Sequence, residues 1–106
     1  MDYRESFFAL YLNQANKVLG IKKVSECGIS STLVDVRIVM QAALLCNATA
    51  LIVAHNHPSG NLKPSSADIQ MTLQIREAGK ILNISLLDHV ILTSDSYFSF
   101  ADEGLM

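Results

Sequence analysis

Two histidines, His55 and His57, stand one residue apart in the stretch AHNHPSGNLKPSSADI, and Asp68 follows near its end. In extended backbone, residues i and i+2 point to the same face of a strand, so both imidazoles are placed to chelate one ion. Two histidines and one carboxylate are a common ligand set in catalytic zinc sites, where water takes the fourth position. The spacing therefore predicts a zinc site made by His55, His57 and Asp68.

A purely structural interpretation stays open for each of these residues. Histidines also occur in polar loops where hydrogen bonds satisfy both ring nitrogens. Ser65 and Asp68 match a helix start, with serine as the N-cap and an acid three residues later at the positive end of the helix. A His-x-His pair alone is a weak signal, and the acid on the following element makes the set more specific.

The elements around this stretch are expected to bring the three residues to one end of a core strand. The short apolar run at residues 50–54 is typical of a central strand. Proline, serine and glycine at residues 58–60 make the turn that ends it. Ser65 then opens a helix that we expect to end near Asn83. Strand, turn and helix start together position the candidate ligands.

The rest of the chain is predicted to surround this unit with strands and one further helix. We expect a strand at residues 6–13, a turn at 13–16, a hairpin partner at 17–25, a loop or short strand at 28–34, a helix at about 36–46 capped by Asp35, and strands at 85–93 and 97–100. The helix at 36–46 is apolar nearly all round and is expected to be buried. This order predicts an α/β or α+β domain over residues 1–106, with a mixed sheet and helices on it in two or three layers.

Composition limits the class of protein further. Half of the 106 residues are hydrophobic and only 17% are charged, which is enough apolar surface for a core and excludes a disordered chain. The apolar content also favours a homo-oligomer or an additional flanking segment. The formal net charge is −2, and no run of basic residues exceeds Lys22-Lys23, so we expect no direct nucleic-acid binding by this domain.

Location is predicted from the same data. No apolar stretch reaches transmembrane length, and the N-terminal residues do not resemble a signal peptide, so no membrane partner is expected. Cys27 and Cys46 lack metal-type spacing and are expected to be reduced thiols in a cytoplasmic protein.

Four segments carry a resemblance to a known family: AHNHPSG, PSSADIQMT, EAGK and LLDHVIL. Together they resemble the RadC-type JAB domain of the JAMM (MPN+) metalloprotease-like family, over residues 5–104. The resemblance implies a JAB/cytidine-deaminase-like fold, in which helices sandwich a mixed sheet. It also implies that the three predicted ligands bind Zn²⁺.

The same resemblance implies two further site residues. The family has a glutamate at the start of its first strand that acts as general base and acid toward the zinc-bound water, and this role falls on Glu5. Glu26 is the alternative, although its position after the second strand fits a solvent-facing residue. The Ser65 hydroxyl is implied as a donor to the oxyanion that develops on the attacked carbonyl.

We therefore expect a zinc-dependent hydrolase that cleaves amide or isopeptide bonds in a protein or peptide. Deubiquitinating members of the family have Ser or Thr where this chain has Asn56, and they carry insertions that this chain is too compact to hold, so ubiquitin chains are not the expected substrate. Two alternatives stay open: a non-catalytic zinc-containing module associated with DNA repair, which is the family's label, or with mobile elements, and a metal-free scaffold. Asp88 and His89 are expected to be hydrogen-bonded core residues, with support of a metal ligand as the alternative.

Overall fold

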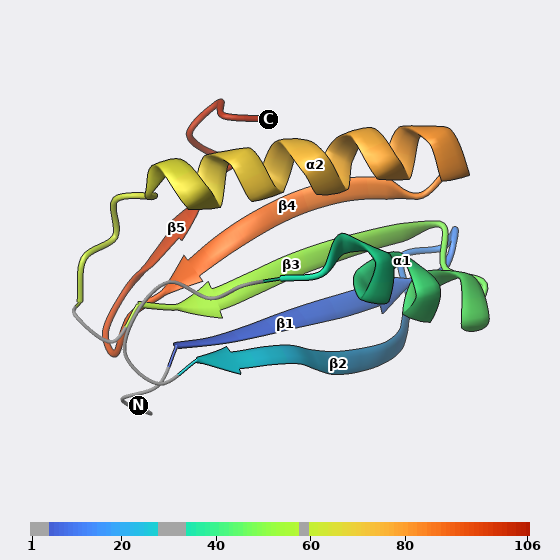
Figure 1. The fold of residues 1–106 in the computed structure, drawn as a ribbon, viewed down its shortest axis with the longest axis horizontal. Coiled ribbons are helices and arrows are strands. Elements are labelled where there is room, and N and C mark those ends of the chain that lie inside the picture. The colour runs from blue at the N-terminus through green and yellow to red at the C-terminus, as the bar shows by residue number, and fades with distance from the viewer. Residues whose placement is uncertain (1–4, 28–33, 58–59) are drawn as a thin grey trace.

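The computed structural model describes residues 5–27, 34–57 and 60–106, with the backbone alone described at residues 5 and 25–27 (Figure 1). Its five strands form one sheet in the order β2-β1-β3-β4-β5, with two helices packed on it. The elements are β1 (Glu5–Leu12), β2 (Val18–Cys27), α1 (Val36–Leu45), β3 (Ala50–Asn56), α2 (Ser66–Leu82), β4 (Ser85–Leu92) and β5 (Tyr97–Ser99).

The sheet is mixed, as the sequence predicted. Strand β1 is antiparallel to both β2 and β3, β3 is parallel to β4, and β5 is antiparallel to β4. The parallel pair requires a crossover connection, and α2 supplies it. The predicted hairpin and the two C-terminal strands are confirmed. The predicted loop or short strand at 28–34 falls almost entirely outside the described residues.

Both helices pack on the same face of the sheet. In the β1–β3 register, Tyr11 pairs with Leu51 and Phe7 with His55, and residues an even number apart along a strand share a face. The Tyr11 hydroxyl donates a hydrogen bond to the Val39 carbonyl of α1 at 2.8 Å, and Asp68 of α2 contacts His55. The predicted α+β fold, a mixed sheet with helices on it, is confirmed, and within the described residues the helices cover one face and form two layers with the sheet (Figure 1).

Helix α1 begins where the sequence predicted but is buried only along one stripe. The Asp35 side chain accepts a hydrogen bond from the Arg37 backbone N–H and so caps the helix. Val39, Met40 and Ala43 pack into the core. Leu45 is 80% exposed, so the expectation of a wholly buried helix was wrong. A helix that lies on one sheet buries only the stripe that faces it, however apolar its other side is.

Helix α2 has well-defined ends. Ser65 caps its start, and Asn83 ends it in the left-handed conformation at φ 59°. A Cβ atom at Gly79 would lie only 2.1 Å from the Ile84 carbonyl oxygen, so glycine lets the chain turn closely from α2 toward β4. None of the helices in the described ranges is long and apolar enough to cross a membrane.

Candidate metal centre

The predicted ligands meet at the carboxyl end of β3, where the chain turns toward α2. Strand β3 extends beyond the predicted run to Asn56, so His55 lies within the strand and pairs with Phe7 of β1 and Ile91 of β4. His57 follows directly, and its backbone N–H donates a hydrogen bond to the Leu92 carbonyl at 2.8 Å. Strand ends that face a helix N-terminus are frequent ligand sites in sheets with parallel strands.

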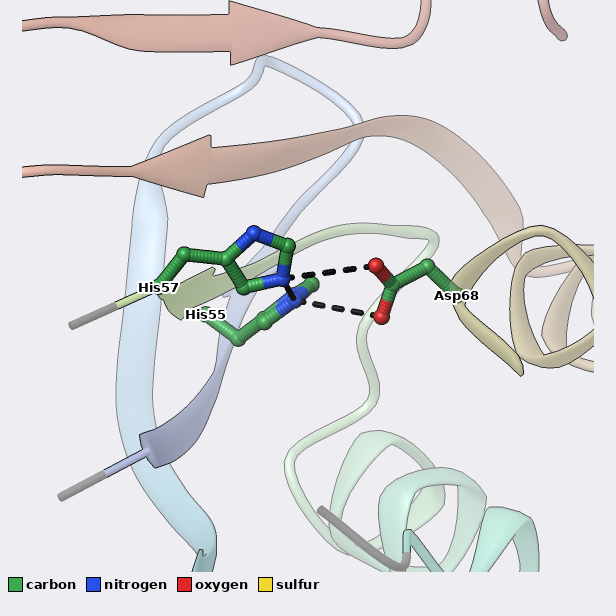
Figure 2. Close-up of side chains that lie close together, drawn as sticks. All are labelled: His55, His57 and Asp68. Carbon is green, nitrogen blue, oxygen red and sulfur yellow. Dashed lines mark hydrogen bonds and ion pairs between the residues drawn. The ribbon is translucent and has the colours of Figure 1, made fainter. Parts of the chain in front are cut away.

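Asp68 reaches from the first turn of α2 toward the two imidazole rings (Figure 2). The His55 Nε2 and His57 Nε2 atoms are 2.8 Å apart. The Asp68 carboxylate places one oxygen 3.2 Å from His55 Nε2 and the other 3.4 Å from His57 Nε2. The three residues each offer a ligand atom within 4.8 Å of the others, so the geometry brings together the set that the spacing predicted.

The separations of these atoms fit a divalent metal ion. Ligand atoms at ~2.0–2.2 Å from zinc in tetrahedral geometry lie about 3.3 Å from one another. The two histidine-to-carboxylate distances, 3.2 and 3.4 Å, match this value. The two histidine nitrogens, at 2.8 Å, need to separate by about half an ångström, which small rotations of the side chains provide. Two nitrogens and one oxygen are also the donor types that zinc accepts.

The helix-start role of Asp68 and its ligand role exist together. The Ser65 backbone N–H donates to the Asp68 carboxylate at 2.8 Å, and the Asp68 backbone N–H donates to the Ser65 hydroxyl oxygen at 3.1 Å. Burial alone would raise the pKa of the Asp68 carboxyl, but the His55 ring and the Ser65 donors outweigh burial and lower that pKa. Asp68 is therefore a carboxylate at neutral pH and can serve both the cap and a cation.

A backbone carbonyl orients the His57 ring. His57 Nδ1 lies 2.8 Å from the Asn61 carbonyl oxygen. Because a carbonyl oxygen can only accept, Nδ1 carries the proton and donates it. In the neutral ring the lone pair is then on Nε2, the atom that faces His55 and Asp68.

His55 contacts a second buried histidine. Its Nδ1 atom lies 2.8 Å from Nε2 of His89, which stacks on Phe100 with ring centroids 4.5 Å apart. Burial, followed by the nearby His55 ring, lowers the pKa of His89 to about 3, so this ring is neutral at physiological pH. His89 is thus both a core residue and a support for a candidate ligand. Asp88 is structural, because it accepts hydrogen bonds from Ser99 and Ala101.

The two candidate general bases are described only by their backbone. Glu5 begins β1 two residues before Phe7, whereas Glu26 pairs with Ser6. Since alternate positions share a strand face, position 5 belongs to the face of His55 and position 26 to the opposite face. Their side chains lie outside the described residues, so the role of Glu5 stays a prediction. Ser65 is located as the N-cap, one turn before Asp68.

The sequence did not identify two polar residues around the centre, Asn61 and Thr72. Asn61 orients His57 through its backbone, and Thr72 lies 2.6 Å from His89 through its hydroxyl oxygen. The Asn56 side chain accepts a hydrogen bond from the Ser6 backbone N–H at 2.6 Å and so ties the end of β3 to the start of β1. This bond gives Asn56 a structural role.

Comparisons with known proteins agree with the resemblance of the motifs. A family model described as "RadC-like JAB domain" matches residues 1–105. A UPF0758 protein of Flavobacterium johnsoniae is 50% identical over 101 residues, which are 95% of this chain and 44% of that protein. A UPF0758 protein of Porphyromonas gingivalis is 45% identical over 104 residues, 97% of this chain and 46% of that protein. The chain thus spans about half the length of these relatives.

Proposed function

The chain belongs to the RadC-like JAB domain family, and from this premise we propose that it is a zinc-dependent hydrolase acting on amide or isopeptide bonds. The observation that carries the proposal is the convergence of His55, His57 and Asp68 at distances that match a zinc coordination shell. A three-residue set leaves one coordination position for water or substrate, as catalytic zinc sites require.

The residues around the site have defined roles in this proposal. His55, His57 and Asp68 would hold the zinc ion, which would supply Lewis-acid chemistry and a nucleophilic water near neutral pH. Glu5 would accept a proton from the attacking water and return it to the leaving amine. The Ser65 hydroxyl oxygen accepts a hydrogen bond from the Asp68 N–H. Its own O–H is left to donate a hydrogen bond to the oxygen of the attacked carbonyl.

We propose a protein or peptide substrate rather than a nucleic acid. The formal net charge of −2 does not favour binding to a phosphate backbone, and the ligand set suits polarisation of a carbonyl group. The cytoplasmic location and a homo-oligomeric state belong to the same proposal.

Metal binding is the first test. Protein purified without chelator is expected to contain one zinc per chain, whereas His57→Ala is expected to lose it because one of three ligands is gone. Elemental analysis and competition with a chromophoric chelator measure this difference. Zinc should also raise the unfolding free energy of the wild type, by ~2.7 kcal/mol when free zinc is about 100 times Kd, and not that of the variant. Equal zinc in both proteins rejects the site.

Catalysis is tested by Glu5→Gln, which keeps the size of the side chain but cannot accept a proton. We expect unchanged zinc affinity and a turnover of peptide or isopeptide substrates lower by about 10²–10⁴-fold. Glu26→Gln is the matched control and should retain both properties. If Glu5→Gln hydrolyses substrate at the wild-type rate, Glu5 is not the base, and loss of turnover in Glu26→Gln instead would reverse the two assignments.

A further inference from the structure

A continuous line of polar contacts runs through the protein interior behind the candidate metal centre. His55 Nδ1 lies 2.8 Å from His89 Nε2, and His89 Nδ1 lies 2.6 Å from the Thr72 hydroxyl oxygen. The Thr72 hydroxyl donates to the Asp68 backbone carbonyl at 2.8 Å. His55, His89 and Thr72 are each at most 2% exposed, so this line is shielded from water.

The number of protons along this line fixes its direction. A hydroxyl has one proton, and Thr72 donates it to the Asp68 carbonyl, so Thr72 can only accept from His89. His89 Nδ1 must then carry the proton of that neutral ring, and His89 Nε2 is left as an acceptor. His55 Nδ1 must in turn carry its proton to donate to His89 Nε2. With Nδ1 engaged in this way, Nε2 is the nitrogen of His55 that is left to bind a cation, and it faces Asp68.

We propose that Thr72 and His89 are positioning residues that hold His55 in the one tautomer able to bind metal through Nε2. The proposal rests on the metal site proposed above and adds how that site is prepared. His57 reaches the same tautomer through the Asn61 carbonyl. The tautomers of the two ligand histidines are thus fixed by different partners. A backbone carbonyl fixes that of His57, and the hydrogen-bonded side chains of His89 on β4 and Thr72 on α2, called the relay below, fix that of His55.

The opposite direction of the relay has the opposite consequence. If the Thr72 proton pointed to His89 Nδ1, the His89 ring would carry its proton on Nε2 and donate it to His55 Nδ1. His55 would then carry its proton on Nε2, where it blocks the ligand atom. The bond from Thr72 to the Asp68 carbonyl excludes this arrangement, and it also ties the relay to the residue that supplies the third ligand.

The first test reads the tautomers of the wild-type protein without metal. Long-range ¹H–¹⁵N NMR of protein labelled in the histidine rings distinguishes a protonated from an unprotonated ring nitrogen. We expect His89 to carry its proton on Nδ1. A His89 ring protonated on Nε2 overturns the relay. This measurement does not depend on metal, so it stands even if wild-type protein binds no zinc and the proposed function fails.

The second test compares Thr72→Val with Thr72→Ser. Valine has nearly the shape of threonine but removes the acceptor for His89. The His89 proton is then no longer fixed on Nδ1, and zinc affinity is expected to fall by about 10–100-fold. Serine keeps the hydroxyl and is expected to retain both the wild-type affinity and the tautomer. Wild-type affinity and tautomer in Thr72→Val, or equal loss in both variants, contradict the proposal.

Discussion

The inner face of the sheet changes from apolar to polar along three alternate residue pairs of β1 and β3, Tyr11–Leu51, Ala9–Val53 and Phe7–His55. Tyr11 pairs with Leu51 under α1, and Phe7 pairs with His55 under the start of α2. Leu51 and His55 are almost equally buried, at 0% and 1% exposure. The two regions are therefore equally removed from water, and they differ in the interactions that stabilise them.

The region under α1 is stabilised by packing. Leu51 lies in a core cluster with Val39, Met40 and Ala43 of α1. Dispersion and hydrophobic contacts have no fixed direction, so side chains of similar volume can replace one another here at a modest cost. What this region cannot tolerate is a loss of volume, because the surrounding side chains fill a cavity only in part.

The region under the start of α2 depends on the direction of its hydrogen bonds. A change of shape matters less here than the placement of a proton, as Thr72 illustrates: valine would fill the same volume and still remove the acceptor for His89. A buried polar group that loses its partner costs about 1–3 kcal/mol, so the hydrogen bonds of such a network must all be made. Two equally buried regions therefore constrain the sequence differently: one requires side chains of the right volume, and the other requires donors and acceptors in the right places.

This difference also explains what the sequence could predict. Apolar runs and the caps Asp35 and Ser65 predicted the strands and helix starts, because these signals are local. His55, His57 and Asp68 were found for the same reason, since strand alternation and one turn of helix relate them. The contact between His55 and His89 joins residues 34 positions apart, and no local pattern predicts it.

Two other features were hidden from sequence reasoning for physical reasons. Thr72 resembles any threonine in a helix, and only the packing of α2 against β4 shows that its hydroxyl meets a ring nitrogen. The apolar outer side of α1 suggested complete burial, because composition does not reveal how many neighbours a helix has. Leu45, at 80% exposure, shows the difference.

Leu51→Ala gives the largest expected effect on stability and tests whether packing stabilises the α1 region. Removing a fully buried leucine is expected to lower the unfolding free energy by about 2–5 kcal/mol. Urea denaturation of metal-free protein measures it. Leu45→Ala is the matched control on the exposed side of α1 and should change stability by only about 0.5 kcal/mol. Similar losses in both variants would contradict the one-stripe burial of α1.

Tyr11→Phe sharpens the comparison, because Tyr11 makes one directed bond within the apolar region. Its hydroxyl donates to the Val39 carbonyl at 2.8 Å, and losing this bond is expected to lower stability by about 0.5–1.5 kcal/mol at pH 7. Phenylalanine keeps the ring, so packing is nearly unchanged. The smaller loss relative to Leu51→Ala is what a region stabilised by packing requires.

The pH dependence of the same variant separates the bond from the packing. Burial, followed by the nearby Cys46 thiol, raises the pKa of Tyr11 to about 12, above its ordinary value near 10. A raised folded-state pKa contributes stability that is complete below pH ~10 and is lost as pH rises through ~12. The wild type should therefore lose its advantage over Tyr11→Phe across this range in urea denaturation curves. A difference that stays constant from pH 7 to pH 12 would mean that the phenol is not held neutral by its buried site.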